Sequence, residues 1–128
     1  MLSGLDLARL TRLRRDLHAH PELAFGEHRT AGVIAAYLRR LGVEVTTGIG
    51  GTGVVGVVRG RSDGPTVGLR ADMDALPIAE EPPRSHASQV DGVMHACGHD
   101  GHCAMLLGAV EILSRTRDFA GTVIAVFQ

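Results

Sequence analysis

Residues 93–105 of this 128-residue chain, VMHACGHDGHCAM, bring together three histidines and both cysteines of the sequence: His95, Cys97, His99, His102 and Cys103. Imidazole and thiolate groups are common ligands of zinc and related ions, so this segment is a candidate metal site. The same residue types also suit a reactive thiol with a neighbouring histidine base. A helix start that happens to be rich in histidine is the third interpretation.

The metal interpretation is most specific for Cys97 and His99. Gly98 argues against helix at the start of the segment, so residues 95–99 are expected to be extended, with His95, Cys97 and His99 on one face. Cys97 and His99 could then donate to one ion or to an adjacent pair, at about 2.3 Å and about 2.0–2.1 Å if the metal is zinc. Two ligands are too few for a closed site, so the others must come from elsewhere in the fold.

Two aspartates in LRADMDALP, Asp72 and Asp74, are expected at the carboxyl end of a strand, where open α/β sheets bind ligands. In extended geometry both carboxylates face one way. They could bind a metal, orient a liganding histidine or help to set the pKa of a metal-bound water. Aspartates at a strand end are also common turn formers, and that alternative stays open.

The other candidate residues have weaker patterns. Asp100 or His99 is expected to cap the helix that follows, whose amides favour the thiolate form of Cys97. Cys103 lies within an apolar run and is predicted to be a small buried hydrophobe. His102 lies one helical turn after His99, and both a site role and a structural role stay open. Polar loop roles are expected for the remaining histidines, which are His18, His20, His28 and His86.

The elements that must position these residues follow from hydrophobic periodicity and from glycine and proline signals. The first helix has Ser3 or Asp6 as its expected cap and ends before Pro21, while Gly42 ends the second. In order, we expect helices over 5–19 and 30–41, strands over 43–47, 54–58 and 65–71, a loop over 77–94, a helix over 104–114 and a strand over 121–127.

These elements predict a layered α/β fold. The segment VVGVV, residues 54–58, is apolar on both sides, which favours a sheet with helices on both faces. The glycine-rich GIGGTG, residues 48–53, is interpreted as a hairpin turn, because no helix follows it to hold a nucleotide phosphate. RGRSDG, residues 59–64, is expected to be a further turn.

Composition excludes several classes of function. The net charge is −1, and the 13 basic residues are all arginines scattered along the chain, so no nucleic-acid surface is expected. With aromatic residues at 3%, base stacking is an improbable mode of recognition. No signal peptide and no run approaching the roughly 20 apolar residues of a membrane helix is seen, which predicts a cytoplasmic protein without a membrane partner.

Five segments, in this order, resemble the amidohydrolase branch of the aminoacylase and carboxypeptidase-like dinuclear metallopeptidases: LRRDLHAHPEL, TGIGGTGVVGVV, VGLRADMDALPI, MHACGHDGHCAMLLGA and GTVIAVFQ. That group includes hippurate hydrolases and N-acyl-amino-acid amidohydrolases. The resemblance implies that Cys97 and His99 are metal ligands and that Asp74 is a catalytic residue beside two divalent ions. Zinc or manganese is favoured, and cobalt and nickel stay open. Threonine is the expected residue at Cys103.

The resemblance further implies that residues 1–128 are the N-terminal portion of an incomplete zinc-peptidase-like catalytic domain. In such enzymes a general-base glutamate follows the GTVIAVFQ strand, and a lid or dimerisation domain comes later. The longer parent protein is expected to hydrolyse amide bonds of N-acyl amino acids or related small amides. The resemblance is also compatible with a homo-oligomeric parent. The 128-residue fragment is expected to be inactive by itself. The alternatives are a non-catalytic metal-binding or interaction module, and a thiol enzyme with Cys97 as nucleophile.

Overall fold

The computed structural model describes residues 4–81 and 84–128. The elements are α1 (Leu7–Ala19), α2 (His28–Arg40), β1 (Glu44–Ile49), β2 (Gly53–Arg59), β3 (Ser62–Ala71), α3 (His99–Thr116) and β4 (Ala120–Phe127). This order confirms the sequence of elements predicted above. Among the described residues, no helix is both long and apolar enough to cross a membrane.

The ends of the first two helices show how local sequence sets them. Asp6 is the cap of α1, and its Oδ1 accepts a hydrogen bond from the Arg9 amide at 2.9 Å. The other expected cap, Ser3, lies outside the described residues. Beyond α2 the chain turns at Gly42, whose φ of 72° favours glycine, so this predicted helix stop is confirmed.

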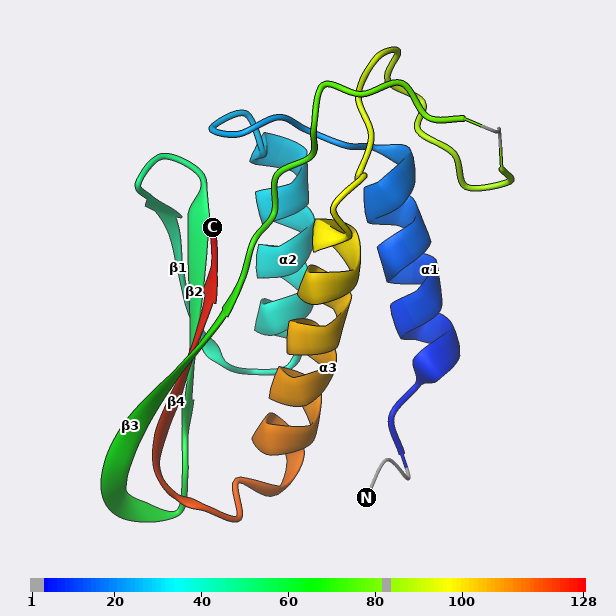
Figure 1. Ribbon diagram of the computed structural model, residues 1–128. Coiled ribbons are helices and arrows are strands. Elements are labelled where there is room, and N and C mark those ends of the chain that lie inside the picture. The colour runs from blue at the N-terminus through cyan, green and yellow to red at the C-terminus, as the bar shows by residue number, and fades with distance from the viewer. Residues whose placement is uncertain (1–3, 82–83) are drawn as a thin grey trace.

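The four strands form one sheet in the order β1-β2-β4-β3, with β3 and β4 parallel and the other neighbours antiparallel. The predicted hairpin turn joins β1 to β2, but it is shorter than the expected residues 48–53, because β1 continues to Ile49 and β2 starts at Gly53. The expected turn over 59–64 is shorter than predicted, because Ser62 already pairs with Ala120 and starts β3. The parallel pair requires a crossover, which α3 supplies together with the segment before it (Figure 1).

That long segment has the predicted loop character. Residues 77–81 and 84–94 contain no helix or strand, while residues 82 and 83 lie outside the described part. Leu76 and Met94 pair in an isolated antiparallel bridge, each amide donating to the other's carbonyl at 3.0 Å. The bridge closes the loop at its base and delivers the chain to the histidine-rich segment.

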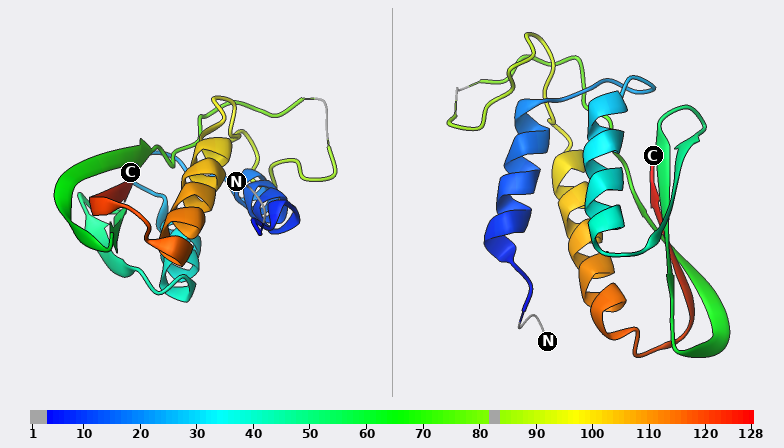
Figure 2. Two further views of the ribbon diagram at one scale, coloured as in Figure 1. Left: turned by 90° about the horizontal axis from the view of Figure 1, so that it is seen from below. Right: turned by 180° about the vertical axis from the view of Figure 1, so that it is seen from behind.

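All three helices lie on one side of the sheet, with α2 and α3 against the strands and α1 packed on α3 (Figures 1 and 2). The α/β class is as expected, but helices on both faces are not found in residues 4–81 and 84–128. Val54 and Val58 of β2 are fully buried on the helical side, whereas Val55 and Val57 are half-buried on the other. The outward valines pair with Val126 and Ile124 of β4, so neighbouring apolar side chains shield one another without a helix.

A buried carboxylate ties the three helices together inside this layer. The side chain of Glu111, in α3, is completely buried and receives hydrogen bonds from Arg9 of α1, at 2.6 Å, and from the Tyr37 hydroxyl of α2. Arg115, one turn along α3, also donates to it. Burial and the bond to Glu111 raise the pKa of Tyr37 to about 12, so the phenol stays protonated and donates.

Candidate metal centre

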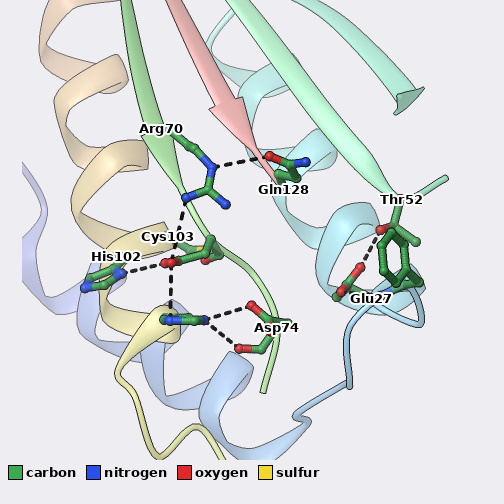
Figure 3. Close-up of polar contacts among 10 residues, drawn as sticks. Glu27, Thr52, Arg70, Asp74, His102, Cys103 and Gln128 are labelled. Atoms are coloured by element: carbon green, nitrogen blue, oxygen red, sulfur yellow. Dashed lines mark hydrogen bonds and ion pairs between the residues drawn. The ribbon is translucent and has the colours of Figure 1, made fainter. Parts of the chain in front are cut away.

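The carboxyl ends of β3 and β4 meet the start of α3 at one edge of the sheet. The backbone holds this junction in place: the Gln128 amide donates to the Ala71 carbonyl at 3.0 Å, and the Met73 amide donates to the Gln128 carbonyl at 2.9 Å. Asp74 therefore leaves the strand beside the N-terminus of α3 (Figure 3). Asp72 lies there too, because its carboxylate bonds to His102 in the first turns of α3. This is the edge at which open α/β sheets bind ligands.

His99 lies between the two aspartates. Its Nδ1 is 2.9 Å from Oδ1 and 2.8 Å from the backbone oxygen of Asp74, and its Nε2 is 3.3 Å from Oδ2 of Asp72. Because both acceptors at Nδ1 are oxygens of Asp74, that nitrogen is the donor. The proton and the orientation of the ring are thus fixed by Asp74, which leaves Nε2 for a ligand.

Asp72 also bonds to the second histidine of α3. His102 Nδ1 lies 2.6 Å from Asp72 Oδ1, and the rings of His99 and His102 are stacked with centroids 5.4 Å apart. Burial raises the pKa of Asp72, but the hydrogen bond from His102 and the proximity of His99 outweigh it and hold the pKa below the ordinary value. The carboxylate is therefore ionised at neutral pH, as a metal ligand must be.

These three side chains have the geometry of a cation site. One ligand atom each of Asp72, His99 and His102 can be chosen so that all lie within 4.8 Å of one another. Mixed oxygen and nitrogen donors suit zinc and manganese, among other divalent ions. The residues present therefore fit at least one divalent ion.

Of the three predicted site residues, the structure brings His99 and Asp74 into direct contact, and Cys97 is exposed and is not a member of the group formed by Asp72, His99 and His102. The expectation that His95, Cys97 and His99 share one face is wrong, because His95 is buried while Cys97 is exposed. The chain bends at Cys97, and Gly98, with a φ of 86°, then turns it into α3. The segment is bent where extended geometry was expected.

The helix cap also differs from the prediction. Gly98 occupies the N-cap position of α3, and neither His99 nor Asp100 caps it through its side chain. Asp100 lies in the first turn and is buried, where it bonds to His18 and Arg14. His18 was expected to have a polar loop role, yet it is buried within α1. No local signal around His18 marks this contact, since Asp100 follows 82 positions later.

Sequence reasoning left the roles of Asp72 and His102 open, although a usable signal was present. His99 and His102 are three residues apart on a helix, which places both imidazoles on one side. Asp72 precedes Asp74 by two positions, and both carboxylates reach the same histidine. Together the two spacings indicated one site, but only the fold places the two aspartates opposite the two histidines.

Cys103 is the small buried hydrophobe that its position predicted. Its thiol donates to the Asp72 carbonyl at 3.2 Å, and burial, with smaller effects of Asp72 and Asp100, raises its pKa to about 12. A thiol with this pKa is not ionised at neutral pH. Cys103 is therefore unsuited to metal binding or nucleophilic attack.

We expect the two thiols of the native chain to react very differently with iodoacetamide at pH 8. Exposed Cys97 is alkylated, while Cys103 reacts at least about 100-fold more slowly, because it is buried and un-ionised. Mass spectrometry at timed intervals measures both, and urea brings both to similar rates. The Cys97→Ser variant should lose the fast reaction. Equal rates in the native protein would contradict the buried position of Cys103.

A small pocket adjoins the candidate centre. It has a volume of about 180 Å³, and its polar lining includes Asp74, Arg70, Glu27 and Thr52. Buried Glu27 accepts hydrogen bonds from the Thr52 hydroxyl and from the backbone amide of Phe25, at 2.7 Å for the latter (Figure 3). Glu27 thus joins the loop before α2 to the β1–β2 hairpin and forms one wall of the pocket.

A larger hollow of about 550 Å³ lies elsewhere, between α1 and α3. It is lined mainly by apolar side chains such as Leu7, Leu10 and Met105. Arg14 is its one ionisable lining residue, so it offers no set of groups for acid–base or metal chemistry. The smaller pocket beside Asp74 is the better candidate for a reaction site, in spite of its size.

Residues 68–128 match Peptidase family M20/M25/M40. The match includes Asp72, Asp74 and the whole histidine-rich segment, and it confirms the resemblance to aminoacylase and carboxypeptidase-like metallopeptidases. The chain is 49% identical over 121 residues to thermostable carboxypeptidase 1 of Saccharolobus solfataricus, covering 93% of this chain and 31% of that protein. It is 46% identical over 122 residues to N-acetylcysteine deacetylase of Bacillus subtilis, covering 94% and 32%.

The fold is also that of solved M20 structures. The YXEP protein of Bacillus subtilis, a dinuclear metal-binding peptidase of the M20 family, superposes with a TM-score of 0.91 at 46% sequence identity. The superposition covers 94% of this chain and 35% of that one. The present chain thus spans about a third of the length of these relatives.

Proposed function

We propose that this chain is the N-terminal portion of the catalytic domain of an M20 metal-dependent amidohydrolase. The longer protein hydrolyses amide bonds in N-acyl amino acids or related small amides. The observation that carries this proposal is the position of His99, held at Nδ1 by Asp74 and facing Asp72 with Nε2, within a group of side chains that fits a divalent ion.

Within this proposal, Cys97 and His99 are metal ligands. The similarity to the dinuclear YXEP protein supports a pair of divalent ions. We favour zinc or manganese for these ions. Asp74 keeps the proton of His99 on Nδ1 and so presents Nε2 to the metal. Bound ions of this kind polarise an amide carbonyl and lower the pKa of a water molecule. Asp72 and His102 face the same position and supply further donors.

Amide hydrolysis also needs a group that takes a proton from water and delivers it to the leaving amine. The family resemblance assigns that role to a glutamate in a segment that follows the GTVIAVFQ strand, and a lid or dimerisation domain to a later one. We therefore propose that the 128-residue chain does not turn over substrate by itself. The cytoplasmic location and the homo-oligomeric state of the longer protein stay predictions.

Small acyl substrates are supported by the pocket beside Asp74. A volume of about 180 Å³ suits a short acyl group better than a folded polypeptide. One relative, N-acetylcysteine deacetylase, is named for removing the acetyl group of an N-acyl amino acid. Arg70, whose Nε is 3.3 Å from Gln128 Oε1, adds a positive charge to the pocket wall.

Hydrolysis of hippurate and N-acetyl-L-methionine, followed by release of the free amino acid, tests the proposal. We expect the longer protein to be active with Zn²⁺ or Mn²⁺ and inactive after chelation, and the 128-residue chain to bind metal without turnover. Turnover by the chain alone would overturn its proposed inactivity. Metal binding without hydrolysis by the longer protein would support a non-catalytic module, and activity lost on alkylation but kept with chelator would support a thiol enzyme.

A further inference from the structure

A buried histidine behind the metal centre bonds to two carboxylates from distant parts of the chain. His18, next to the last residue of α1, has Nδ1 2.9 Å from Asp100 Oδ2 and Nε2 2.7 Å from Glu80 Oε1. The exposed fraction of each of these three side chains is 6% or less. Such a buried arrangement is costly to assemble unless its charges and hydrogen bonds are matched.

Both carboxyl groups have polar partners. Burial raises the pKa of Glu80, but the bonds from His18 and from the Ser88 amide hold it below the ordinary value, so Glu80 is ionised. Both ring nitrogens of His18 lie within hydrogen-bonding distance of a carboxyl oxygen, Asp100 Oδ2 at Nδ1 and Glu80 Oε1 at Nε2. Arg14 Nε lies 2.8 Å from Asp100 Oδ2 and adds a positive charge beside it. The two carboxyl groups thus share His18 as a partner, and Asp100 has Arg14 as well.

On one side, this histidine holds the segment that leads to the metal ligands. Glu80 Oε2 accepts the Ser88 amide at 2.5 Å, and the Gln89 amide donates to the Ala19 carbonyl at the end of α1 at 2.8 Å. Residues 84–94 are thereby attached to α1 through Glu80, Ser88 and Gln89. The same segment ends at Met94, directly before His95.

On its other side, His18 holds the start of α3. Asp100 immediately follows His99, and its position in the first helical turn determines where the His99 imidazole projects. His18 is therefore the one residue in the described part of the chain that bonds to both Glu80 and Asp100. A shift of residues 84–94 reaches His99 through three hydrogen bonds, Ser88 to Glu80, Glu80 to His18 and His18 to Asp100, and one peptide link.

We infer that His18 is a positioning residue that couples the order of residues 84–94 to metal binding at Cys97 and His99. The inference rests on the proposed metal site. Since such coupling is reciprocal, metal should order the segment, and the ordered segment should favour metal by the same factor. A His18 that merely stabilises the fold would lower the free energy of unfolding without linking these two quantities.

Amide exchange at Ser88, with and without Zn²⁺, tests this in the 128-residue chain, because that amide reports the Glu80 contact directly. We expect saturating Zn²⁺ to slow Ser88 exchange about tenfold in the wild-type chain. His18→Gln should abolish the slowing and weaken Zn²⁺ binding about tenfold, as loss of groups that hold ligands does. The matched control is His28→Gln, at an exposed histidine of α2, which should change neither quantity.

Glu80→Gln keeps the His18–Asp100 bond and provides a second variant should His18→Gln fail to fold. It is expected to remove the effect of Zn²⁺ on Ser88 as well. If either folded variant keeps the full tenfold effect, the coupling is wrong while the metal site stands. If the wild-type chain binds no Zn²⁺, this inference is overturned, while the proposed function is tested separately by the activity of the longer protein.

Discussion

His99→Ala should lower the Zn²⁺ affinity of the 128-residue chain by about 100-fold or more, the largest functional effect of any single change expected here. The substitution removes the imidazole that Asp74 orients and that faces Asp72. The carboxylates of Asp72 and Asp74 then remain at the sheet edge without the imidazole that lies between them. Calorimetric titration with Zn²⁺, or the absorption of bound Co²⁺, measures the loss.

Two further histidine variants make this result specific. His102→Ala should weaken Zn²⁺ binding about tenfold, because the ring bonds to Asp72 but is more exposed than that of His99. His28→Ala, at an exposed position of α2, should leave the affinity unchanged. If the His99 and His28 variants bound Zn²⁺ equally, the assignment of the metal site to the start of α3 would be refuted.

The largest effect on stability is expected from Glu111→Ala, which should lower the free energy of unfolding by about 3 kcal/mol. The variant leaves the buried Tyr37 hydroxyl without its acceptor and opens a cavity between the three helices. Arg9 and Arg115 are partly exposed and can turn toward water, which keeps the loss at the lower end of the range for a broken buried pair. Urea unfolding followed by circular dichroism gives the value.

The matched control is the surface pair Arg59–Glu44, with a separation of 2.9 Å and more than half of each side chain exposed. Glu44→Ala should cost no more than about 0.5 kcal/mol, because water already screens the exposed charges. Comparable losses in the two variants would mean that the Glu111 cluster contributes no more than a surface ion pair.

The contribution of Glu111 should also depend on pH in a defined direction. Burial raises the pKa of Glu111, but the bonds from Tyr37 and Arg9 and the charges of Arg9 and Arg115 hold it below the ordinary value of 4.5. The stabilisation from the ionised form is therefore complete above pH 4.5 and is lost as the pH falls through the lower pKa of the folded state. The difference in the free energy of unfolding between the wild-type protein and Glu111→Gln should become smaller as the pH falls through that range.

The secondary structure and the candidate residues could be predicted because their signals are local. The apolar face of α2 and the glycine after it fixed that helix, and the alternating and apolar segments fixed the strands. Asp74 and His99 were identified from motifs a few residues long. Contacts between these motifs could not be predicted, since the geometry between positions 74 and 99 depends on a loop without a repeating pattern.

The sequence by itself determined the elements, their order, the resemblance to M20 hydrolases and the residue types that suit a metal. Only the tertiary structure decided which side chains meet, because pairing β3 in parallel with β4 places Asp72 and Asp74 opposite the start of α3. It also placed His95 in the interior and left Cys97 exposed, since the chain bends at Cys97 where an extended course was expected. Likewise, tertiary packing brings His18 into contact with the carboxyl groups of Glu80 and Asp100. The residues next to His18 in the sequence do not predict these two contacts.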